Sequence, residues 1–445
     1  MTQTLFDDIE MTPAIAVNGG GQERERIARK FAPLLREEPR LGSLVAYGGN
    51  RSVPFLRLYR YKEAFSFELV REFQRRFALT PADYVFDPFA GMGTTLFASM
   101  LQGMDSIGVD RLPIACFVAQ TLPKFLSCQC GQLRAAFERL VRIVPEIEPA
   151  PAAMDVAIMP LAFLEETRLE LCRWKAAIET LDGDLRDVFR LLFFAILEAT
   201  SFTSKDGQFL RLKRDKVTAD PTDVLQQKVA EAEADLARAP RLFPFWEQAK
   251  NHLPTVCVGD TRDLTGTPFR RPPTAIITSP PYVNRYDYTR SYCLELCFHF
   301  IRNFDDLKAI RFGVLRSHIE SKVGSDEQPP HPVIAEVVDA LKPKDLNNPR
   351  IPLMLIGYFV DMQKVIAEWA RVLARGAQVA MVVDNVRFEG ELVPVDLVLS
   401  EMAESVGFRV KEIIVTRYKG NSSQQMKKYG RVPVRESIVV WQLEG

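Results

Sequence analysis

DPFAGMGTT, residues 87–95, follows a short apolar run at 84–86 that is typical of a buried strand. Two glycines in this turn permit a tight backbone path and a close approach of a ligand. Residues 94–101 predict a helix, and residues 106–110 predict a second strand. A strand, a glycine-rich turn, a helix and a second strand make a βαβ unit. The stretch therefore predicts an α/β fold built on a parallel sheet.

Further strands and helices alternate along the rest of the chain. Strand patterns recur at 255–258, 275–278 and 378–383, helical patterns at 355–374 and 395–405, and strand patterns close the chain at 408–416 and 434–441. We therefore predict a doubly wound, Rossmann-like α/β sheet with a terminal antiparallel hairpin.

The patterns divide the chain into parts. Residues 1–45 lack sustained periodicity and predict a poorly ordered N-terminal segment. Residues 46–124 and 251–445 are expected to form the catalytic domain. Between them, residues 125–250 are mostly helical in pattern and far longer than one crossover helix, so they predict a large helical insertion. Residues 302–350 form a second irregular region.

Composition narrows the class of protein. The 445 residues include 57 Lys and Arg against 57 Asp and Glu, so binding to nucleic acid would need local basic patches rather than overall charge. No apolar run approaches the length of a membrane span, and the acidic N-terminus lacks a signal-peptide core. We expect a cytoplasmic protein without a membrane span. The seven cysteines lack zinc-site spacings, so we expect reduced thiols and no metal.

Two strand-end carboxylates accompany the glycine turn. Asp110 ends the second strand, where it can accept hydrogen bonds from ribose hydroxyls. Asp260 follows the strand at 255–258, where it can accept from the amine of an adenine ring. Acids at the ends of successive parallel strands converge on one crevice. Each carboxylate alone fits a plain turn or a helix N-cap equally well, and the turn itself is neither a P-loop nor a dinucleotide fingerprint.

A proline-rich turn, Ser279-Pro280-Pro281-Tyr282, ends the strand at 275–278. Two successive prolines fix an extended turn and remove two N–H donors. The Ser279 hydroxyl and neighbouring carbonyl oxygens are then acceptors facing a cavity, and Tyr282 offers a flat face for a planar base. The same residues also fit a proline-terminated edge strand.

Together the two turns resemble those of the S-adenosylmethionine-dependent amino-methyltransferases that act on DNA bases. Residues 87–94 match that family's Asp-Pro-Phe-x-Gly-x-Gly-Thr turn, 279–282 match its turn for the target amine, and 59–66 match a further segment loosely. The resemblance implies catalysis by Ser279, Pro280, Pro281 and Tyr282. It implies that S-adenosyl-L-methionine is bound by Asp87, Phe89, Ala90, Gly91, Gly93, Thr94, Asp110 and Asp260.

The resemblance also implies a reaction, sequence-specific methylation of duplex DNA by base flipping and direct transfer. Hydrogen bonds from the target amine to Ser279 and to the Pro280 carbonyl would draw its nitrogen towards tetrahedral geometry, so positioning and electrostatics carry the catalysis. Serine in the first turn position is more usual in cytosine-N4 enzymes, which favours cytosine. Alternatives are an adenine-N6 enzyme, an RNA guanine-amine methyltransferase and an inactive nucleic-acid-binding relative.

Several basic residues are candidates for contacts with DNA phosphates, which supply affinity without sequence preference. A solvated charged face fits those far from the catalytic turn equally well. We expect the insertion to be the target-recognition region, with 302–350 as the alternative, and a restriction nuclease or other defence system as a functional partner. The candidates are Arg285 and Arg290 after the catalytic turn, Arg211, Lys213 and Arg214 in the insertion, and Lys427 and Lys428 between the closing strands.

Overall fold

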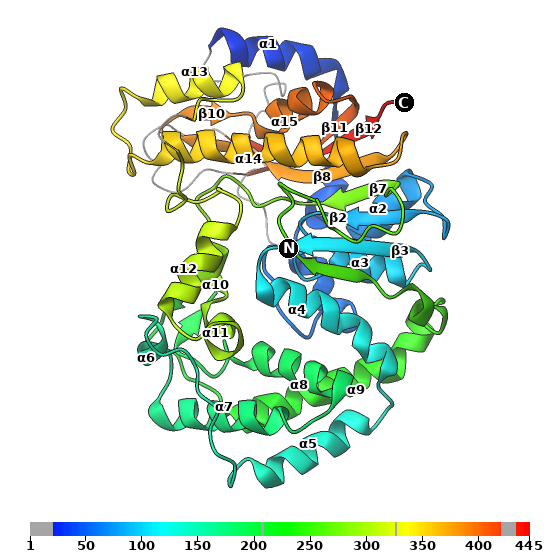
Figure 1. Cartoon of the computed structure of the whole chain (residues 1–445), viewed down its shortest axis with the longest axis vertical. Helices are drawn as coiled ribbons and strands as arrows, with labels where there is room; N and C mark the ends of the chain where they lie inside the picture. Colours follow the sequence, from blue (N-terminus) through cyan, green and yellow to red (C-terminus); the bar gives the residue numbers. More distant parts are fainter. Residues whose placement is uncertain (1–20, 206–208, 325–326, 420–432) are drawn as a thin grey trace.

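An eight-stranded sheet forms the centre of the protein in a computed structural model (Figure 1). The structure describes residues 21–205, 209–324, 327–419 and 433–445. Within this sheet β12 is antiparallel to both of its neighbours and the other pairings are parallel, which confirms the predicted α/β fold with its closing hairpin. The strand order is β1 (Leu35–Glu37), β11 (Phe408–Lys419), β12 (Val434–Leu443), β8 (Gln378–Asp384), β7 (Ala275–Thr278), β2 (Tyr84–Asp87), β3 (Asp105–Asp110) and β6 (Thr255–Val258).

The strand order reverses between β2 and β7. From β2 the chain adds β3 and then β6 on one side, and it returns to add β7 and β8 on the other. The loops that follow β2 and β7 therefore open at the same edge of the sheet. In doubly wound sheets this is the place where ligands bind.

Helices cover both faces of the sheet. On one face α2, α3 and α4 bury their apolar sides, and on the other face α1, α13, α14 and α15 form a second core. Figure 1 shows α1, α13, α14 and α15 gathered at the top of the view, with α4 below the strands. The bounds are α1 (Gln22–Phe31), α2 (Phe67–Arg76), α3 (Thr94–Met100), α4 (Pro113–Thr121), α13 (Pro332–Leu341), α14 (Ile351–Val372) and α15 (Val395–Glu404).

The N-terminal segment differs from the expectation. A poorly ordered stretch over 1–45 is wrong for residues 21–45, since α1 and β1 are formed and β1 joins the edge of the sheet. The Arg24 side chain is 3% exposed and pairs with Glu336 at 2.7 Å and Glu391 at 2.6 Å. These partners lie far along the chain, so local periodicity could not reveal them.

The region 302–350 is also more regular than expected. It contains α12 (Phe304–Gly313) and α13, which begins where His331 accepts a hydrogen bond from the Val333 N–H. The helices α10 (Tyr288–Ser291) and α11 (Cys293–Glu295) precede it and lead from the sheet towards the insertion (Figure 1).

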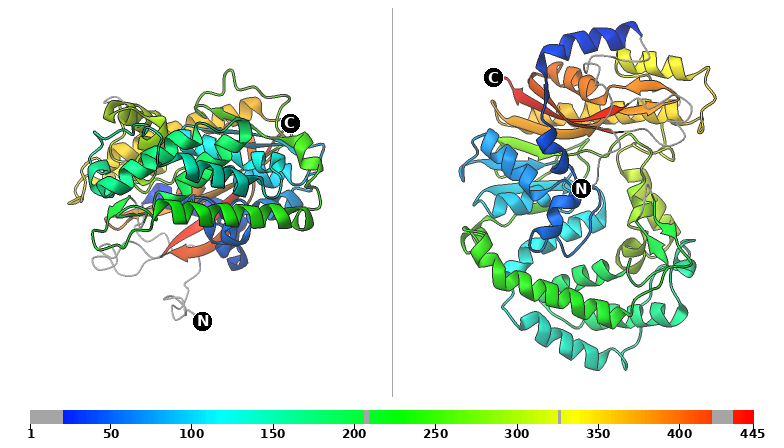
Figure 2. Two further views of the ribbon diagram at one scale, coloured as in Figure 1. Left: turned by 90° about the horizontal axis from the view of Figure 1, so that it is seen from below. Right: turned by 180° about the vertical axis from the view of Figure 1, so that it is seen from behind.

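The insertion is a helical layer packed below the sheet. Its helices are α5 (Gln132–Ile143), α6 (Met159–Ala162), α7 (Glu165–Ile178), α8 (Gly183–Ile196) and α9 (Pro221–Leu242), and a short hairpin joins β4 (Thr203–Ser204) to β5 (Arg211–Leu212). From behind and below, the same layer closes one end of the molecule (Figure 2).

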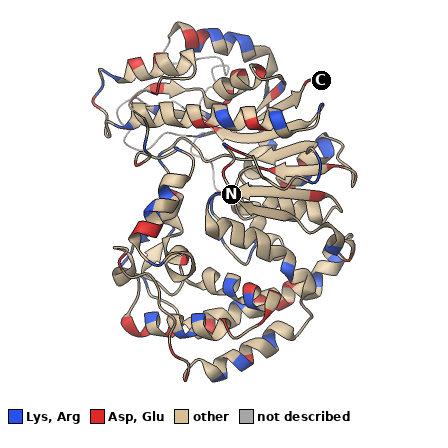
Figure 3. Cartoon of the chain, in the orientation of Figure 1, with Lys and Arg blue, Asp and Glu red and all other residues tan. Residues whose placement is uncertain are grey.

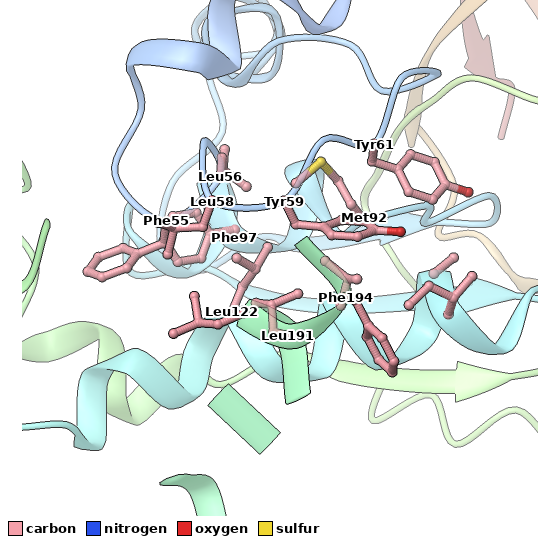
Figure 4. Packing of buried hydrophobic residues seen from close by; sticks show 14 of the residues in the cluster. Phe55, Leu56, Leu58, Tyr59, Tyr61, Met92, Phe97, Leu122, Leu191 and Phe194 are labelled. Atoms are coloured by element: carbon pink, nitrogen blue, oxygen red, sulfur yellow. The ribbon is translucent and has the colours of Figure 1, made fainter. Parts of the chain in front are cut away.

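The insertion shares a hydrophobic core with the sheet. One continuous cluster of buried residues spans both, and Figure 4 shows Leu191 of α8 near Leu122 and Phe97 of the sheet domain. Asp235 of α9 is fully buried and bonds the Arg57 guanidinium at 3.0 Å. The insertion is therefore packed against the sheet as part of one hydrophobic core.

Shorter elements complete the described chain. None of the described helices has the length and apolar character needed to cross a membrane. The remaining elements are η1 (Ala32–Leu34), η2 (Pro39–Ser43), η3 (Tyr47–Ser52), η4 (Leu122–Ser127), η5 (Gln248–His252), the π-helical η6 (Leu296–Phe300), β9 (Val386–Phe388) and β10 (Glu391–Val393).

Candidate active site

The glycine turn after β2 requires its glycines. Gly91 and Gly93 adopt φ values of +51° and +83°, a region that favours glycine. A Cβ atom on Gly93 would lie 2.7 Å from the Cβ of Ala119 on α4, so there is also no space for a side chain. Gly91 instead lies at the surface of a pocket, and a Cβ there would point towards the Tyr61 ring at 3.4 Å.

Asp87, at the end of β2, links this strand to the end of β7. The Thr278 hydroxyl at the end of β7 donates to Asp87 Oδ1 at 2.6 Å, and the Phe89 N–H donates to the same oxygen at 3.2 Å. Burial raises the pKa of Asp87 to about 6, although these hydrogen bonds act in the opposite direction. This carboxyl fixes the β2 and β7 loops relative to each other and lies behind the pocket wall.

Asp110, at the end of β3, holds the glycine turn through a hydrogen bond to its backbone. Its Oδ2 accepts from the Gly91 N–H at 2.8 Å, and its Oδ1 accepts from the Leu112 N–H at 2.8 Å. Burial raises the pKa of this carboxyl, and the two backbone donors oppose that shift. Each oxygen keeps a lone pair that can accept from a ligand.

Asp260 has an additional partner that the sequence pattern did not predict. Arg262 donates to both of its carboxylate oxygens, at 2.9 and 2.7 Å, and continues to Asp361 on α14 at 2.9 Å. Burial acts to raise the pKa of Asp260, but the hydrogen bonds from Arg262 lower it below its ordinary value. The carboxylate is thus ionised and held in place at the end of β6.

These features line one pocket, which we name the glycine-turn pocket. Of the predicted cofactor residues, Asp87 and Gly93 lie behind its wall, and the other six line it. The Thr94 hydroxyl oxygen is buried there without a hydrogen-bond partner among the described residues, so it can bond a ligand. The lining is Tyr61, Glu63, Ala64, Phe65, Pro88, Phe89, Ala90, Gly91, Met92, Thr94, Asp110, Arg111, Leu112, Gly259, Asp260, Thr261, Arg262, Ser279, Pro281, Tyr288, Val314 and Leu315.

The proline-rich turn after β7 is anchored to its neighbours. The Ser279 hydroxyl donates to the Val382 carbonyl on β8 at 3.1 Å, which leaves the oxygen lone pairs of Ser279 available. The Tyr282 hydroxyl donates to Glu436 Oε1 at 3.2 Å, and Lys419 Nζ lies 5.7 Å from the centre of the Tyr282 ring. Both side chains are therefore oriented by β8, β11 and β12.

A second pocket, the proline-turn pocket, opens beside this turn. Four residues line both pockets: Glu63, Ala64, Ser279 and Tyr288. Two ligands in these pockets would consequently meet at Ser279. The lining of the second pocket is Val45, Ala46, Lys62, Glu63, Ala64, Ser279, Pro280, Tyr282, Asn284, Tyr286, Tyr288, Asp384, Arg417, Lys419 and Glu436.

Charges line the far wall of the proline-turn pocket. Glu436 is almost fully buried and pairs with Arg417 and with Lys419 Nζ at 2.5 Å. Lys419 also contacts Asp384 at 3.2 Å, and burial raises the pKa of Asp384 to about 6. Sequence reasoning missed this wall because its members come from three strands and belong to no contiguous pattern.

The 59–66 segment contributes more than its loose resemblance indicated. Tyr61 and Phe65 line the glycine-turn pocket, and Glu63 and Ala64 reach both pockets. The signal that could have found them is the alternation of aromatic and charged residues, directly before a helix whose N-cap is Ser66.

The predicted nucleic-acid contacts are distributed unevenly. Arg285 adopts φ +72° and donates to Asn347, whereas Arg290 pairs with Asp287 and Glu320. Phe209, next to the insertion hairpin, lines a surface hollow together with both arginines. The remaining candidates are Arg211, Lys213 and Arg214, which are exposed on that hairpin, and Lys427 and Lys428, which lie outside the described residues.

Elsewhere the charges are intermixed. Lys and Arg alternate with Asp and Glu over both the sheet and the insertion (Figure 3). In the described parts of the chain, no group of three or more His, Cys, Asp or Glu side chains is placed to hold a metal ion.

Known proteins similar to this chain identify its family. No family model matches. The type II methyltransferase M.BsoBI of Geobacillus stearothermophilus is 32% identical and aligns with 94% of this chain and 92% of its own length. The type II methyltransferase M.AvaI of Nostoc sp. is also 32% identical, over 94% of each chain. This chain belongs to the type II methyltransferases.

Family membership confirms the resemblance to DNA methyltransferases that the two turns predicted. Among solved structures, TrmN from Thermus thermophilus aligns with 88% of this methyltransferase and 53% of its own chain, with a TM-score of 0.31 and 9% identity.

Proposed function

We propose that this methyltransferase modifies duplex DNA at a specific sequence, transferring a methyl group from S-adenosyl-L-methionine to the exocyclic N4 amine of cytosine. The observation that carries the proposal is the meeting of the two pockets at Ser279. One pocket has the strand-end carboxylates suited to a nucleoside, and the other has an aromatic face and acceptors suited to a flipped base.

The residues of the glycine-turn pocket fit the cofactor. Asp110 would accept from the ribose hydroxyls through the lone pairs that Gly91 and Leu112 leave free. Asp260 would accept from the adenine amine while Arg262 holds its carboxylate, and the unpartnered Thr94 hydroxyl supplies a further polar contact. When bound, S-adenosylmethionine supplies a methyl group on a positively charged sulfur.

The proline turn would orient the target amine. Ser279 already donates its proton to Val382, so its oxygen presents lone pairs to an amine N–H. The Pro280 carbonyl is a second acceptor, and the Tyr282 face fixes the ring plane by stacking. Accepting both amine protons draws the nitrogen lone pair out of conjugation and towards the glycine-turn pocket.

Contacts with the DNA backbone are proposed at the edge of the proline-turn pocket. Phe209 of the insertion lines a surface hollow with Arg285 and Arg290, which follow the proline-rich turn, and the Arg211 guanidinium lies 5.6 Å from the centre of the Phe209 ring. A duplex there would contact the insertion and the catalytic loop at once, which supports the insertion as the region that reads sequence. Because the chain belongs to the type II methyltransferases, we infer that it acts together with a restriction nuclease or another defence system.

Mass spectrometry of nucleosides tests the proposal. DNA from cells that lack their own methylation and express the chain should contain N4-methylcytosine, and cells expressing Ser279→Ala should contain far less. N6-methyladenine instead would assign the adenine alternative. Equal nucleoside profiles with and without the chain would refute the proposed function.

A further inference from the structure

Glu63 occupies the junction between the two pockets. It is one of the four residues that line both, and with Ser279 and Tyr288 it surrounds the point where the reacting groups would meet. Its Oε2 accepts from the Tyr292 hydroxyl at 2.5 Å. Its Oε1 is buried and has no hydrogen-bond partner among the described residues. A buried carboxylate oxygen without a partner is costly unless a ligand satisfies it.

Tyrosine packing fixes the position of this carboxylate. Tyr292 is fully buried, and its ring stacks on that of Tyr61 with centroids 4.7 Å apart. The Lys62 N–H donates to the same Tyr292 hydroxyl at 3.1 Å. Lys205 Nζ, from the insertion, lies 4.5 Å from the centre of the Tyr292 ring. The Tyr292 ring, whose hydroxyl holds Glu63, is thus contacted both by Tyr61 and by the insertion.

The proposed reaction leaves a proton to be removed. A bond forms from the amine nitrogen to the methyl carbon while the carbon–sulfur bond breaks, and its electron pair stays on sulfur. The nitrogen then carries one hydrogen too many and a positive charge. Ser279 can orient the amine, but a hydroxyl holds a second proton poorly at neutral pH, whereas a carboxylate accepts one readily.

Building on the proposed function, we propose that Glu63 takes the proton that the target amine loses on methylation. The other acids near the junction are less suited. Glu436 is paired with Arg417 and Lys419, and Asp384 contacts Lys419 and lines only the proline-turn pocket. Glu63 differs because its free oxygen lies where both pockets meet. From Glu63 the proton can leave to solvent through the open proline-turn pocket.

Glu63→Gln tests this role, because glutamine keeps an oxygen acceptor for Tyr292 but does not act as a base. In single-turnover transfer of labelled methyl to duplex DNA, with cofactor and DNA saturating, the rate should fall about a hundredfold to ten-thousandfold. Calorimetry should give parental affinities for S-adenosylmethionine, and a filter assay should give a parental affinity for duplex. The matched control is Glu68→Gln, an exposed glutamate on α2, which should behave as the parent.

Chemical rescue separates a base from a structural group. Adding formate to Glu63→Ala should restore part of the methylation rate, and chloride at equal ionic strength should not. The proposal is overturned if Glu63→Gln transfers methyl at the parental rate. It is also overturned if only cofactor affinity falls, or if formate has no effect. Absence of methylated DNA with the parental chain would instead refute the proposed function.

Discussion

The central sheet and the helical insertion share one buried core but expose very different polar groups. The sheet places its polar groups at strand ends, where backbone donors and neighbouring side chains hold each of them, as Asp87 and Asp110 show. The insertion buries its apolar faces against the same core and exposes basic side chains on a short hairpin, around Arg211.

This difference suggests a division of labour. Polar groups held by several hydrogen bonds are suited to catalysis, because catalysis needs reacting groups in a fixed geometry. Exposed charges on a hairpin are suited to a polyanion, whose attraction is long in range and tolerant of position. Substitutions in the sheet should therefore change methyl transfer or cofactor binding, and substitutions on the hairpin should change DNA binding alone.

After Glu63→Gln, the largest effect is expected at the proline turn. Ser279→Ala removes an acceptor that acts mainly in the transition state, so methyl transfer should fall about tenfold to a thousandfold. Tyr282→Ala should cost more, because stacking on a base is worth about 1–3 kcal/mol and the ring orientation is lost as well. Transfer of labelled methyl to duplex DNA measures both.

Controls for the proline turn exclude a folding defect. Tyr282→Phe keeps the ring and loses only the bond to Glu436, which still has Arg417 and Lys419, so most activity should remain. Ser43→Ala, at an exposed serine of η2, should be neutral. Parental rates for both Ser279→Ala and Tyr282→Ala would show that this turn is not catalytic.

The glycine turn should respond in stability as well as in binding. Gly93→Ala combines a left-handed residue, costing about 1–2 kcal/mol, with overlap against Ala119, costing about 1–3 kcal/mol. Gly376→Ala is the matched control, since its φ is +79° and nothing lies within 4 Å of the added Cβ. Urea unfolding should show the larger loss for Gly93. Equal losses would mean that the packing against α4 is unimportant.

Asp110→Ala should weaken S-adenosylmethionine binding by about 1.5–3 kcal/mol, the value of charge-assisted hydrogen bonds. Part of that loss would come from the Gly91 N–H, which would lose its acceptor. Calorimetric titration measures it, and DNA affinity should hold. The comparison variant is Asp263→Ala, whose exposed carboxylate accepts a hydrogen bond from the Thr265 N–H of its own loop and lies outside the glycine-turn pocket. An unchanged cofactor affinity would remove Asp110 from the site.

The parts of the site that could be predicted from the sequence are those formed by residues close together in the chain. The 87–94 and 279–282 turns are contiguous, and each follows a strand, so their convergence at one edge could be derived from topology alone. Arg262 and the wall around Glu436 act through partners distant in sequence. Those contacts depend on tertiary packing and leave no period or spacing in the chain.

The smallest effect is expected on the insertion hairpin, because salt screens exposed charges. Replacing Arg211, Lys213 and Arg214 with Glu should weaken duplex binding and flatten its salt dependence by about one unit of slope for each lost phosphate contact. Cofactor affinity should stay parental, since none of the three lines the glycine-turn pocket. Fluorescence anisotropy across a salt series measures the slope. Unchanged affinity at every salt concentration would show that the hairpin is a solvated surface without a role in DNA binding. The control is charge reversal at three exposed arginines of α5, Arg134, Arg139 and Arg142. An equal loss of affinity in that control would also mean that the hairpin has no specific role.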